Sequence, residues 1–248
     1  MSATLKDQVS IIAGAASVMS IDEVLLALTK QFPGQVIFSS SFSYEDQVIT
    51  HKILNNNLPI KIFTLDTGRL VPETYSVWRA TNEKYNTHIK AYYPDALPLE
   101  KFVEKKGPNA FYESVENRKD CCYIRKVAPL KRALKDNAIW ITGLRAEHSA
   151  DRHNMPQVEW DESNNIIKYH PILHWTTEQV KQFINENDIP YNILHDKGFV
   201  SIGCAPCTRA VRPGEDFRAG RWWWEDNSKK ECGLHIHIDA ETTSQVEK

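Results

Sequence analysis

Strand-like and helix-like segments alternate through the first 145 residues, and this alternation constrains the fold more than any other feature of the sequence. Short runs rich in β-branched and aromatic residues predict strands at 35–38, 60–65, 88–92 and 138–142. The segments between them predict helices at about 20–31, 44–56, 72–86, 96–106 and 119–136. Such alternation predicts an α/β fold in which a parallel, twisted sheet carries helices on both faces.

The pattern loosens after about residue 145. It predicts a short hairpin near Val158 and Ile167 and a helix over 176–187. From Gly198 onward regular periodicity is weak, but chemically functional residue types are dense. We therefore expect an α/β domain at residues 1–200 and an irregular C-terminal segment at 201–248, forming one functional unit that ends in a mobile tail.

The net charge and the lack of long apolar runs each argue against one class of protein. The 248 residues include 30 Lys and Arg against 32 Asp and Glu, a net charge of -2 that excludes a globally basic nucleic-acid-binding protein. No apolar run approaches the roughly 20 residues that a membrane-spanning helix needs. The N-terminal sequence MSATLKDQVS lacks the basic and apolar regions of a secretory signal. We expect a cytoplasmic protein with neither a nucleic-acid nor a membrane partner.

A serine-rich loop, at residues 39–43, follows the first predicted strand and precedes a helix. Free backbone N–H groups and the helix dipole favour anions at such a junction, and serine hydroxyls add donors without adding charge. The sequence contains no Walker loop. A cluster of ordinary helix-capping serines is the alternative, because Ser is favoured at N-caps.

Two further turns follow predicted strands. Residues 65–69 (LDTGR) come after the second strand, and residues 143–145 (GLR) come after the fourth. Ligands of open parallel sheets bind beyond the carboxyl ends of the strands, so these turns and the serine loop together predict a nucleotide cleft. Ordinary turns, in which glycine permits positive φ, are the alternative.

Four of the five cysteines form two pairs, Cys121-Cys122 and Cys204-x-x-Cys207. Clustered cysteines in a reducing compartment are more often metal ligands or reactive thiols than disulfides. The side chains of adjacent residues diverge, so a large iron–sulfur cluster suits Cys121 and Cys122 better than one tetrahedral zinc ion. We therefore favour a 4Fe-4S cluster over the alternative of two buried thiols and a CxxC disulfide.

Basic residues flank both cysteine pairs and favour an anionic substrate. They are Arg118, Lys119, Arg125, Lys126, Lys131 and Arg132 around the first pair, and Arg209, Arg212, Arg218 and Arg221 after the second. Such groups can neutralise charge that develops on departing oxygens. A solvated helix face would give the same pattern.

The fifth cysteine, Cys232, lies in the polar segment ECGLH near the end of the sequence. The thiolate form of cysteine is the nucleophile, and nearby cations lower the pKa of a thiol. Cys232 is therefore a candidate nucleophile, and an incidental exposed cysteine is the alternative.

Together these motifs resemble the sulfonucleotide reductases, the family of the adenylyl-sulfate (APS) and 3'-phosphoadenylyl-sulfate (PAPS) reductases of assimilatory sulfate reduction. The resemblance covers about residues 20–237. It rests on the serine loop and on LDTGRL at 65–70, CCYIRKVAPLKRAL at 121–134, ITGLRAEHSADR at 141–152, CAPCTRAVRPGEDFRAGRWWWE at 204–225 and ECGLH at 231–235. It implies an adenine-nucleotide α-hydrolase-like fold, a 4Fe-4S cluster held by Cys121, Cys122, Cys204 and Cys207, and APS as the substrate.

The resemblance also implies roles for single residues. Contacts with the nucleotide or phosphosulfate fall to Ser39, Ser41, Leu65, Gly143, Arg152, Arg218 and Arg221, and a sulfate contact falls to His235. Cys232 would attack the phosphosulfate sulfur, so that AMP leaves and an S-sulfocysteine forms, while Lys126 and the two C-terminal arginines screen the negative charges. A dithiol protein of the thioredoxin type would then release sulfite.

Two other functions fit parts of this pattern. One is the same chemistry on PAPS. The other is a zinc-bearing nucleotide-binding protein in which Cys232 is incidental. The sequence leaves the oligomeric state open, and a homo-oligomer is compatible with it.

Overall fold

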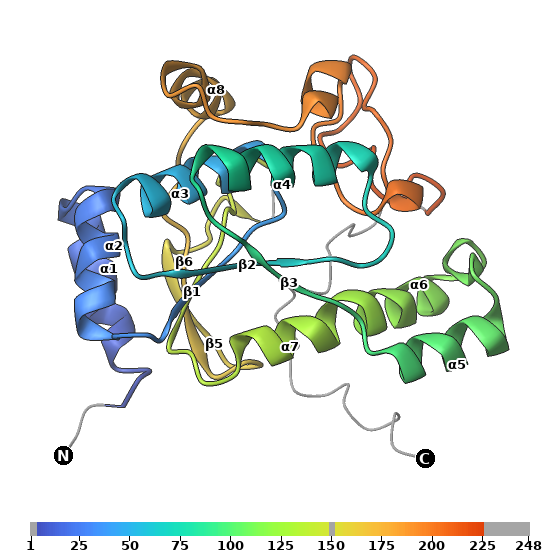
Figure 1. Ribbon diagram of the computed structural model, residues 1–248, viewed down its shortest axis with the longest axis horizontal. Helices are drawn as coiled ribbons and strands as arrows, with labels where there is room; N and C mark the ends of the chain where they lie inside the picture. The colour runs from blue at the N-terminus through green and yellow to red at the C-terminus, as the bar shows by residue number, and fades with distance from the viewer. Residues whose placement is uncertain (1–3, 149–151, 226–248) are drawn as a thin grey trace.

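The computed structural model describes residues 4–148 and 152–225. Among these residues, six strands form one sheet in the order β3-β2-β1-β4-β6-β5. The strands are β1 (Val36–Ser39), β2 (Lys61–Leu65), β3 (Lys90–Tyr92), β4 (Ile139–Ile141), β5 (Val158–Asp161) and β6 (Ile166–Tyr169). Figure 1 shows the sheet running through the middle of the molecule, with helices on either side.

The four strands predicted in the first half of the chain form the parallel part of the sheet. β1 lies between β2 and β4, and Phe38 pairs with Ile62 on one side and Ile141 on the other. The predicted hairpin forms as β5 and β6, in which Trp160 pairs with Ile167. Because β6 runs parallel to β4 and β5 runs antiparallel to β6, the sheet is mostly parallel, with one antiparallel strand at this edge. The predicted α/β fold class is confirmed.

Eight α-helices connect and cover the strands within the described residues. They are α1 (Gln8–Val18), α2 (Ile21–Gln31), α3 (Tyr44–Asn55), α4 (Pro72–Lys84), α5 (Ala96–Lys106), α6 (Val115–Cys122), α7 (Ala128–Leu134) and α8 (Thr177–Glu186). Short 3-10 turns occur at η1 (Ala110–Tyr112), η3 (Ala146–His148), η5 (Ile193–Lys197) and η6 (Ala205–Cys207). None of the described helices is long and apolar enough to cross a membrane.

The core occupies both faces of the sheet. Val36 and Phe38 of β1 pack in the cluster that includes α2, α3 and α8, whereas Ile37 packs with Leu130 of α7 on the opposite face. Successive strand residues point to opposite faces, so a strand buried on both sides must be apolar throughout. This explains why β1 and β4 read as continuous apolar runs.

The helix predicted over 119–136 is three consecutive elements and begins earlier. Ser114 caps α6 by accepting a 3.1 Å hydrogen bond from the backbone N–H of Asn117. A π-helical turn, η2 (Tyr123–Val127), follows the two adjacent cysteines and leads directly into α7. A π turn adds a residue to the helical repeat, and such turns occur frequently at functional sites.

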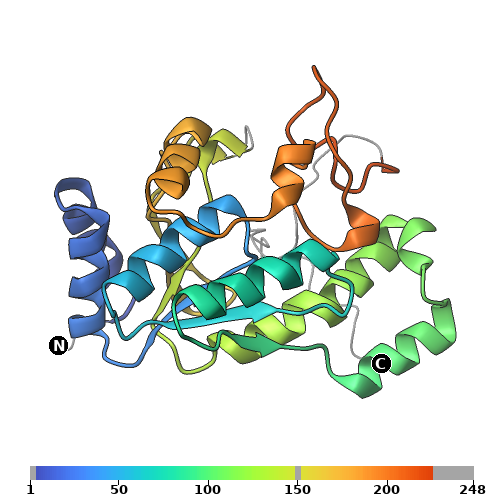
Figure 2. The ribbon, with the colours of Figure 1, turned by 45° about the horizontal axis from the view of Figure 1, so that its top comes forward.

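The segment after α8 is mostly irregular, and several contacts tie it to the rest of the fold. Cys204 forms a β-bridge with Leu70, just beyond the β2 turn. Glu225 forms an ion pair with Arg118 of α6, with Nε and Oε1 2.8 Å apart. Figure 2 shows this segment, in orange and red, beside the end of α4 and next to α6. The second cysteine pair is thereby brought to the first.

Candidate active site

A cavity of about 230 Å³ lies beyond the carboxyl ends of β1, β2 and β4. The C-terminal ends of parallel strands are where ligands of open α/β sheets bind. The residues lining it include Ser39, Ser41, Leu65, Lys126, Gly143, Arg152, Arg218 and Arg221. The structure thus brings together every described residue predicted to handle the nucleotide or phosphosulfate, from five separate parts of the chain. We refer to this as the strand-end cavity.

The serines of the loop do not act as helix caps. Ser43 stands at the N-cap position of α3, but its side chain accepts no capping hydrogen bond within the described part of the chain. Ser39 instead accepts a hydrogen bond from the indole N–H of Trp140, at 2.9 Å. Ser41 donates its backbone N–H and its hydroxyl to Asp46, at 2.5 and 2.6 Å. The loop is therefore held from behind while the serines line the cavity.

Asp46 anchors this loop, a role that its position in the first turn of α3 did not predict. Its side chain is buried, and this burial raises the pKa of Asp46 to about 7 in spite of the two donors from Ser41. A Cβ atom on Gly143 would lie 2.1 Å from the Asp46 Oδ1 atom. Glycine at 143 is therefore required by the close approach of the β4 turn to α3, not by a positive φ.

A second buried group, centred on Arg145, joins three elements behind the cavity. Arg145 donates from Nε to Glu45 of α3 at 3.0 Å and from Nη2 to the Thr177 hydroxyl of α8 at 3.0 Å. Glu147 accepts from the backbone N–H of Thr177 at 2.9 Å. Burial opposes ionisation of Glu45, but His148 and Arg145 outweigh it and lower the pKa of Glu45 to about 2. The prediction placed Arg145 in a turn at the sheet edge and missed this network, because its partners are distant in sequence.

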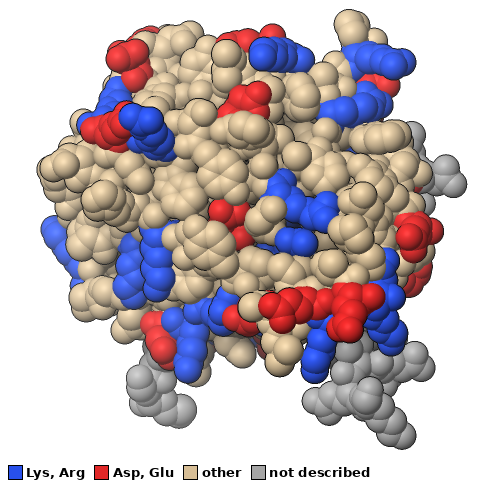
Figure 3. Space-filling model, turned by 45° about the vertical axis from the view of Figure 1, so that its right-hand side comes forward, with Lys and Arg blue, Asp and Glu red and all other residues tan. Residues whose placement is uncertain are grey.

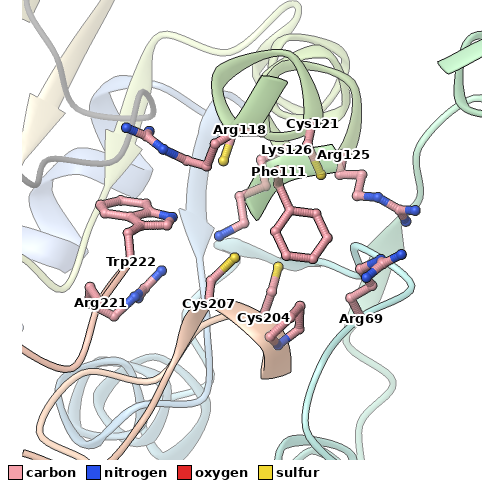
Figure 4. Close-up of a pocket in the computed structure, with 12 residues that line it drawn as sticks. Arg69, Phe111, Arg118, Cys121, Arg125, Lys126, Cys204, Cys207, Arg221 and Trp222 are labelled. Carbon is pink, nitrogen blue, oxygen red and sulfur yellow. The ribbon is translucent and has the colours of Figure 1, made fainter. Parts of the chain in front are cut away.

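A second, smaller cavity contains all four paired cysteines. Cys121 and Cys122 come from the end of α6, and Cys204 and Cys207 come from η6. In Figure 4 the labelled Cys121 faces Cys204 and Cys207 across the cavity, with Phe111 and Trp222 on its walls. The Thr67 hydroxyl lies 3.3 Å from the Cys204 sulfur. We refer to this as the cysteine cavity.

The cysteine cavity holds buried and half-buried thiols and is rich in positive charge. Burial raises the pKa of Cys207 to about 12, and it raises the pKa of Cys121 although Arg125 partly opposes the shift. Arg125 is itself fixed by a 2.6 Å hydrogen bond from Nη1 to the Thr67 carbonyl. The cationic residues that line the cavity are Arg69, Arg118, Arg125, Lys126 and Arg221. Buried thiols with raised pKa values are inert nucleophiles, but they become thiolates when a metal binds.

The arrangement of the cysteines bears on what could bind there. Within residues 4–148 and 152–225, no three Cys, His, Asp or Glu side chains are positioned to hold a single metal ion. Four sulfurs nevertheless line one cavity, and two of them come from adjacent residues. This donor set fits a multi-iron cluster better than one tetrahedral ion.

Two cations, Lys126 and Arg221, line both cavities. Lys126 comes from the π-helical turn, and Figure 4 shows its side chain extending beside Cys207. Arg221 is buried, donates to the Ser201 hydroxyl at 3.3 Å and passes directly over Gly203. A Cβ atom on Gly203 would lie 2.5 Å from its Nη2 atom. Figure 3 shows Lys and Arg side chains gathered in a hollow on one face of the molecule.

Cys232 and His235 lie outside the described residues, so their predicted roles stay predictions. The last described residue, Glu225, is held at α6 by two hydrogen bonds from Arg118, at 2.8 and 2.9 Å. Six residues lie between Glu225 and Cys232 in the sequence.

The model of the phosphoadenosine phosphosulfate reductase domain family matches residues 35–210. The chain belongs to this reductase family. Membership confirms the resemblance predicted from the motifs and the prediction that the protein is an enzyme.

Relatives of this reductase chain span most of its length. An adenosine 5'-phosphosulfate reductase of Burkholderia cepacia is 49% identical over 222 residues, which cover 90% of this chain and 88% of that protein. One of Allochromatium vinosum is 48% identical over 200 residues, covering 81% and 78%. The crystal structure of phosphoadenylyl-sulfate reductase from Candida auris, a phosphate complex, is 28% identical with a TM-score of 0.70, and the match covers 85% of this chain and 99% of that one.

Proposed function

We propose that this protein reduces adenosine 5'-phosphosulfate to sulfite and AMP in sulfate assimilation, with a thioredoxin-type dithiol as the reductant. The observation that carries the proposal is the shared wall between the two cavities. Lys126 and Arg221 line the strand-end cavity, where the nucleotide would bind, and also the cavity of the four cysteines. A phosphosulfate held there would meet cations fixed in a largely buried setting, where their electrostatic effect is strong.

The first step is attack by the Cys232 thiolate on the sulfur atom of the sulfate group. A new S–S bond forms, the S–O bond to the phosphate breaks, and AMP leaves with the bonding electron pair. The enzyme is left as an S-sulfocysteine. Thiolate and phosphosulfate are both anionic, so Lys126, Arg218 and Arg221 would reduce their repulsion and stabilise the charge that develops on the leaving phosphate.

The second step releases sulfite. A thiolate of the reductant attacks the Cys232 sulfur, and sulfite departs with the electrons of the S–S bond. The mixed disulfide that results is resolved by the second thiol of the reductant, which restores the Cys232 thiol and oxidises the dithiol to a disulfide. The two electrons thus come from the dithiol. The C-terminal tail that carries Cys232 would cover the cavity in the first step and open for the second, and His235 would contact the sulfate group.

We propose that Cys121, Cys122, Cys204 and Cys207 hold a 4Fe-4S cluster. The fit rests on four buried or half-buried sulfurs that line one cavity and on the arginines and lysine around them, whose charge would balance a thiolate-bound cluster. When bound, the cluster would order the basic residues and shape their field without exchanging electrons with the substrate. The residues themselves bind, orient and neutralise the phosphosulfate.

The substrate is distinguished by comparing sulfite release from APS and from PAPS with a thioredoxin supplied. We expect APS to be the better substrate, because the relatives that share 48–49% identity with this chain carry the name adenosine 5'-phosphosulfate reductase. Faster release from PAPS would assign the alternative substrate. Release from neither nucleotide would refute the proposed function.

Purification of the protein without air distinguishes an iron–sulfur cluster from a zinc ion. We expect a brown protein that contains iron and acid-labile sulfide. A colourless protein with one equivalent of zinc would favour a zinc-bearing nucleotide-binding protein. We also propose a cytoplasmic location, because a reducing compartment keeps thiols free. A homo-oligomer is compatible with the sequence.

A further inference from the structure

A ring stack between His148 and Phe217 joins two regions that are far apart in sequence. Their ring centroids lie 4.3 Å apart with an interplanar angle of 23°. His148 ends η3 beyond β4, and Phe217 belongs to the irregular segment that follows the second cysteine pair. Neither residue is fully buried, so the stack lies at the edge of the strand-end cavity, which His148 itself lines.

The His148 side of this contact is rigidly mounted. Its Nε2 atom lies 3.1 Å from Glu45 Oε1 and within hydrogen-bond distance of the Arg145 guanidinium. Those partners are buried, with exposed fractions of 6% for Glu45 and 2% for Arg145. The imidazole is therefore oriented by α3 and by the network that reaches α8.

The Phe217 side carries a residue of the proposed substrate site. Arg218 follows it directly, lines the strand-end cavity, and donates its backbone N–H to the Asp216 carboxylate at 2.8 Å. The segment holds itself together at its base, where the Arg209 N–H donates to the Gly220 carbonyl at 2.9 Å and the Arg209 side chain pairs with Glu215 at 2.7 Å. These bonds close the segment on itself, whereas the ring stack attaches it to the sheet domain.

We propose that His148 and Phe217 are positioning residues that fix Arg218 over the strand-end cavity. The inference rests on the proposed function, because it concerns how that site binds its substrate. If the segment were unattached, substrate binding would have to order it, and the lost conformational entropy would weaken binding. The stack orders the segment before the substrate binds. Binding of the phosphosulfate end of the substrate would therefore depend on the stack, whereas binding of the nucleoside end would not.

Hydrogen exchange of the unliganded protein tests the attachment without reference to activity. In His148→Ala and Phe217→Ala we expect amides of residues 212–219 to exchange about three- to tenfold faster, the range expected for one aromatic stack. His148→Phe keeps a ring and should exchange like the parent. His148→Gln keeps a polar end group without a ring and should behave like His148→Ala. His88→Ala, which changes an exposed histidine before β3, is the matched control.

Steady-state kinetics test the consequence for binding. In the two alanine variants we expect the KM for APS to rise about three- to tenfold, while kcat and the inhibition constant of AMP stay within about twofold. In the double variant His148→Ala/Phe217→Ala the KM should rise no further than in His148→Ala alone, because that change has already removed the ring contact of Phe217.

The outcomes separate this inference from the proposed function. If the parent protein releases no sulfite, the function is wrong, and the exchange result still decides whether the stack holds the segment. Unchanged exchange at 212–219 in both alanine variants would overturn the inference even in an active enzyme. So would additive effects in the double variant, an equal loss of AMP and APS affinity, or parental behaviour of His148→Gln.

Discussion

Two glycines fix the shape of the strand-end cavity because the side chains of other residues occupy the space where a Cβ would lie. At Gly143 the obstacle is the Asp46 carboxylate, and at Gly203 it is the Arg221 guanidinium. Asp46 is short, buried and already engaged by the serine loop, whereas Arg221 is long and can shift its end. The two positions should therefore respond differently to the same added methyl group.

We expect Gly143→Ala to raise the Kd of AMP about tenfold or more and to lower the free energy of unfolding by about 1–3 kcal/mol, as overpacking does. Isothermal titration and urea unfolding measure the two effects. Gly14→Ala is the control, because nothing lies within 4 Å of its Cβ position in α1. That change should stabilise the protein by about 0.5–1 kcal/mol. Parental AMP affinity in Gly143→Ala would show that the turn can move away from α3.

Asp46 should make stability depend on pH. Burial raises the pKa of Asp46 to about 7, so the native state keeps a proton that the unfolded chain releases near pH 4. This contribution is complete below about pH 4 and is lost as the pH rises through about 7, so the free energy of unfolding falls over that range. Asp46→Asn, which still accepts from Ser41, should remove the decline in urea unfolding between about pH 5 and pH 8. Asp136→Asn on the surface is the control, and a decline that persists in Asp46→Asn would assign it to another group.

For single residues, the sequence predicts which side chains reach the cavity better than it predicts which hydrogen bonds they form. Ser39, Leu65 and Gly143 could be assigned to one site because each ends a predicted parallel strand, and strand ends share an edge. Asp46 and Arg145 could not be assigned their roles, since their partners become neighbours only when α3, β4 and α8 pack together. The periodicity of one segment contains no information about such contacts.

At the scale of elements, the π-helical turn sets the angle between the cysteine pair and the basic residues that follow it. Removing one residue would convert Tyr123–Val127 to α-helix and change the orientation of Lys126 relative to Cys121 and Cys122. We expect deletion of Tyr123 to cost about a hundredfold in sulfite release, as misplaced catalytic groups do. It should also reduce the visible absorbance per protein. Tyr123→Ala, which trims a half-exposed side chain, should keep both, and an active deletion variant would show that the turn has no role in placing Lys126.

Helices and strands were predictable where their buried residues form a regular apolar pattern in the sequence. α2 has a capping box at Ser20 and Glu23 and a buried apolar stripe, and it lies where predicted. α1 was missed because Ile12 is its single fully buried residue, while Ile11 and Val18 are exposed. The direction of β6 was not predictable either, because the hairpin pattern specifies that β5 and β6 pair but not which neighbour β6 joins.

At the scale of the whole molecule, the ion pair between Arg118 and Glu225 closes the chain around the cysteine cavity. Its side chains are only 7% and 11% exposed, whereas those of the nearby Lys106–Asp120 pair are 32% and 55% exposed. Removing one partner of a buried pair leaves an uncompensated charge, so Arg118→Ala should lower the free energy of unfolding by about 3–5 kcal/mol. Lys106→Ala should change it by less than about 1 kcal/mol. Urea unfolding distinguishes the two, and equal losses would mean that the Arg118 pair is no more than a surface contact.

Because Lys126 and Arg221 line both cavities, a change of charge in one cavity alters the electrostatic potential in the other. An anion that draws Lys126 and Arg221 toward the strand ends withdraws positive potential from the four sulfurs, and electron density added at the sulfurs pulls those cations back. Thermodynamic reciprocity requires the two effects to be equal in free energy. A group bound in the cysteine cavity should therefore report nucleotide binding through its spectrum or midpoint potential.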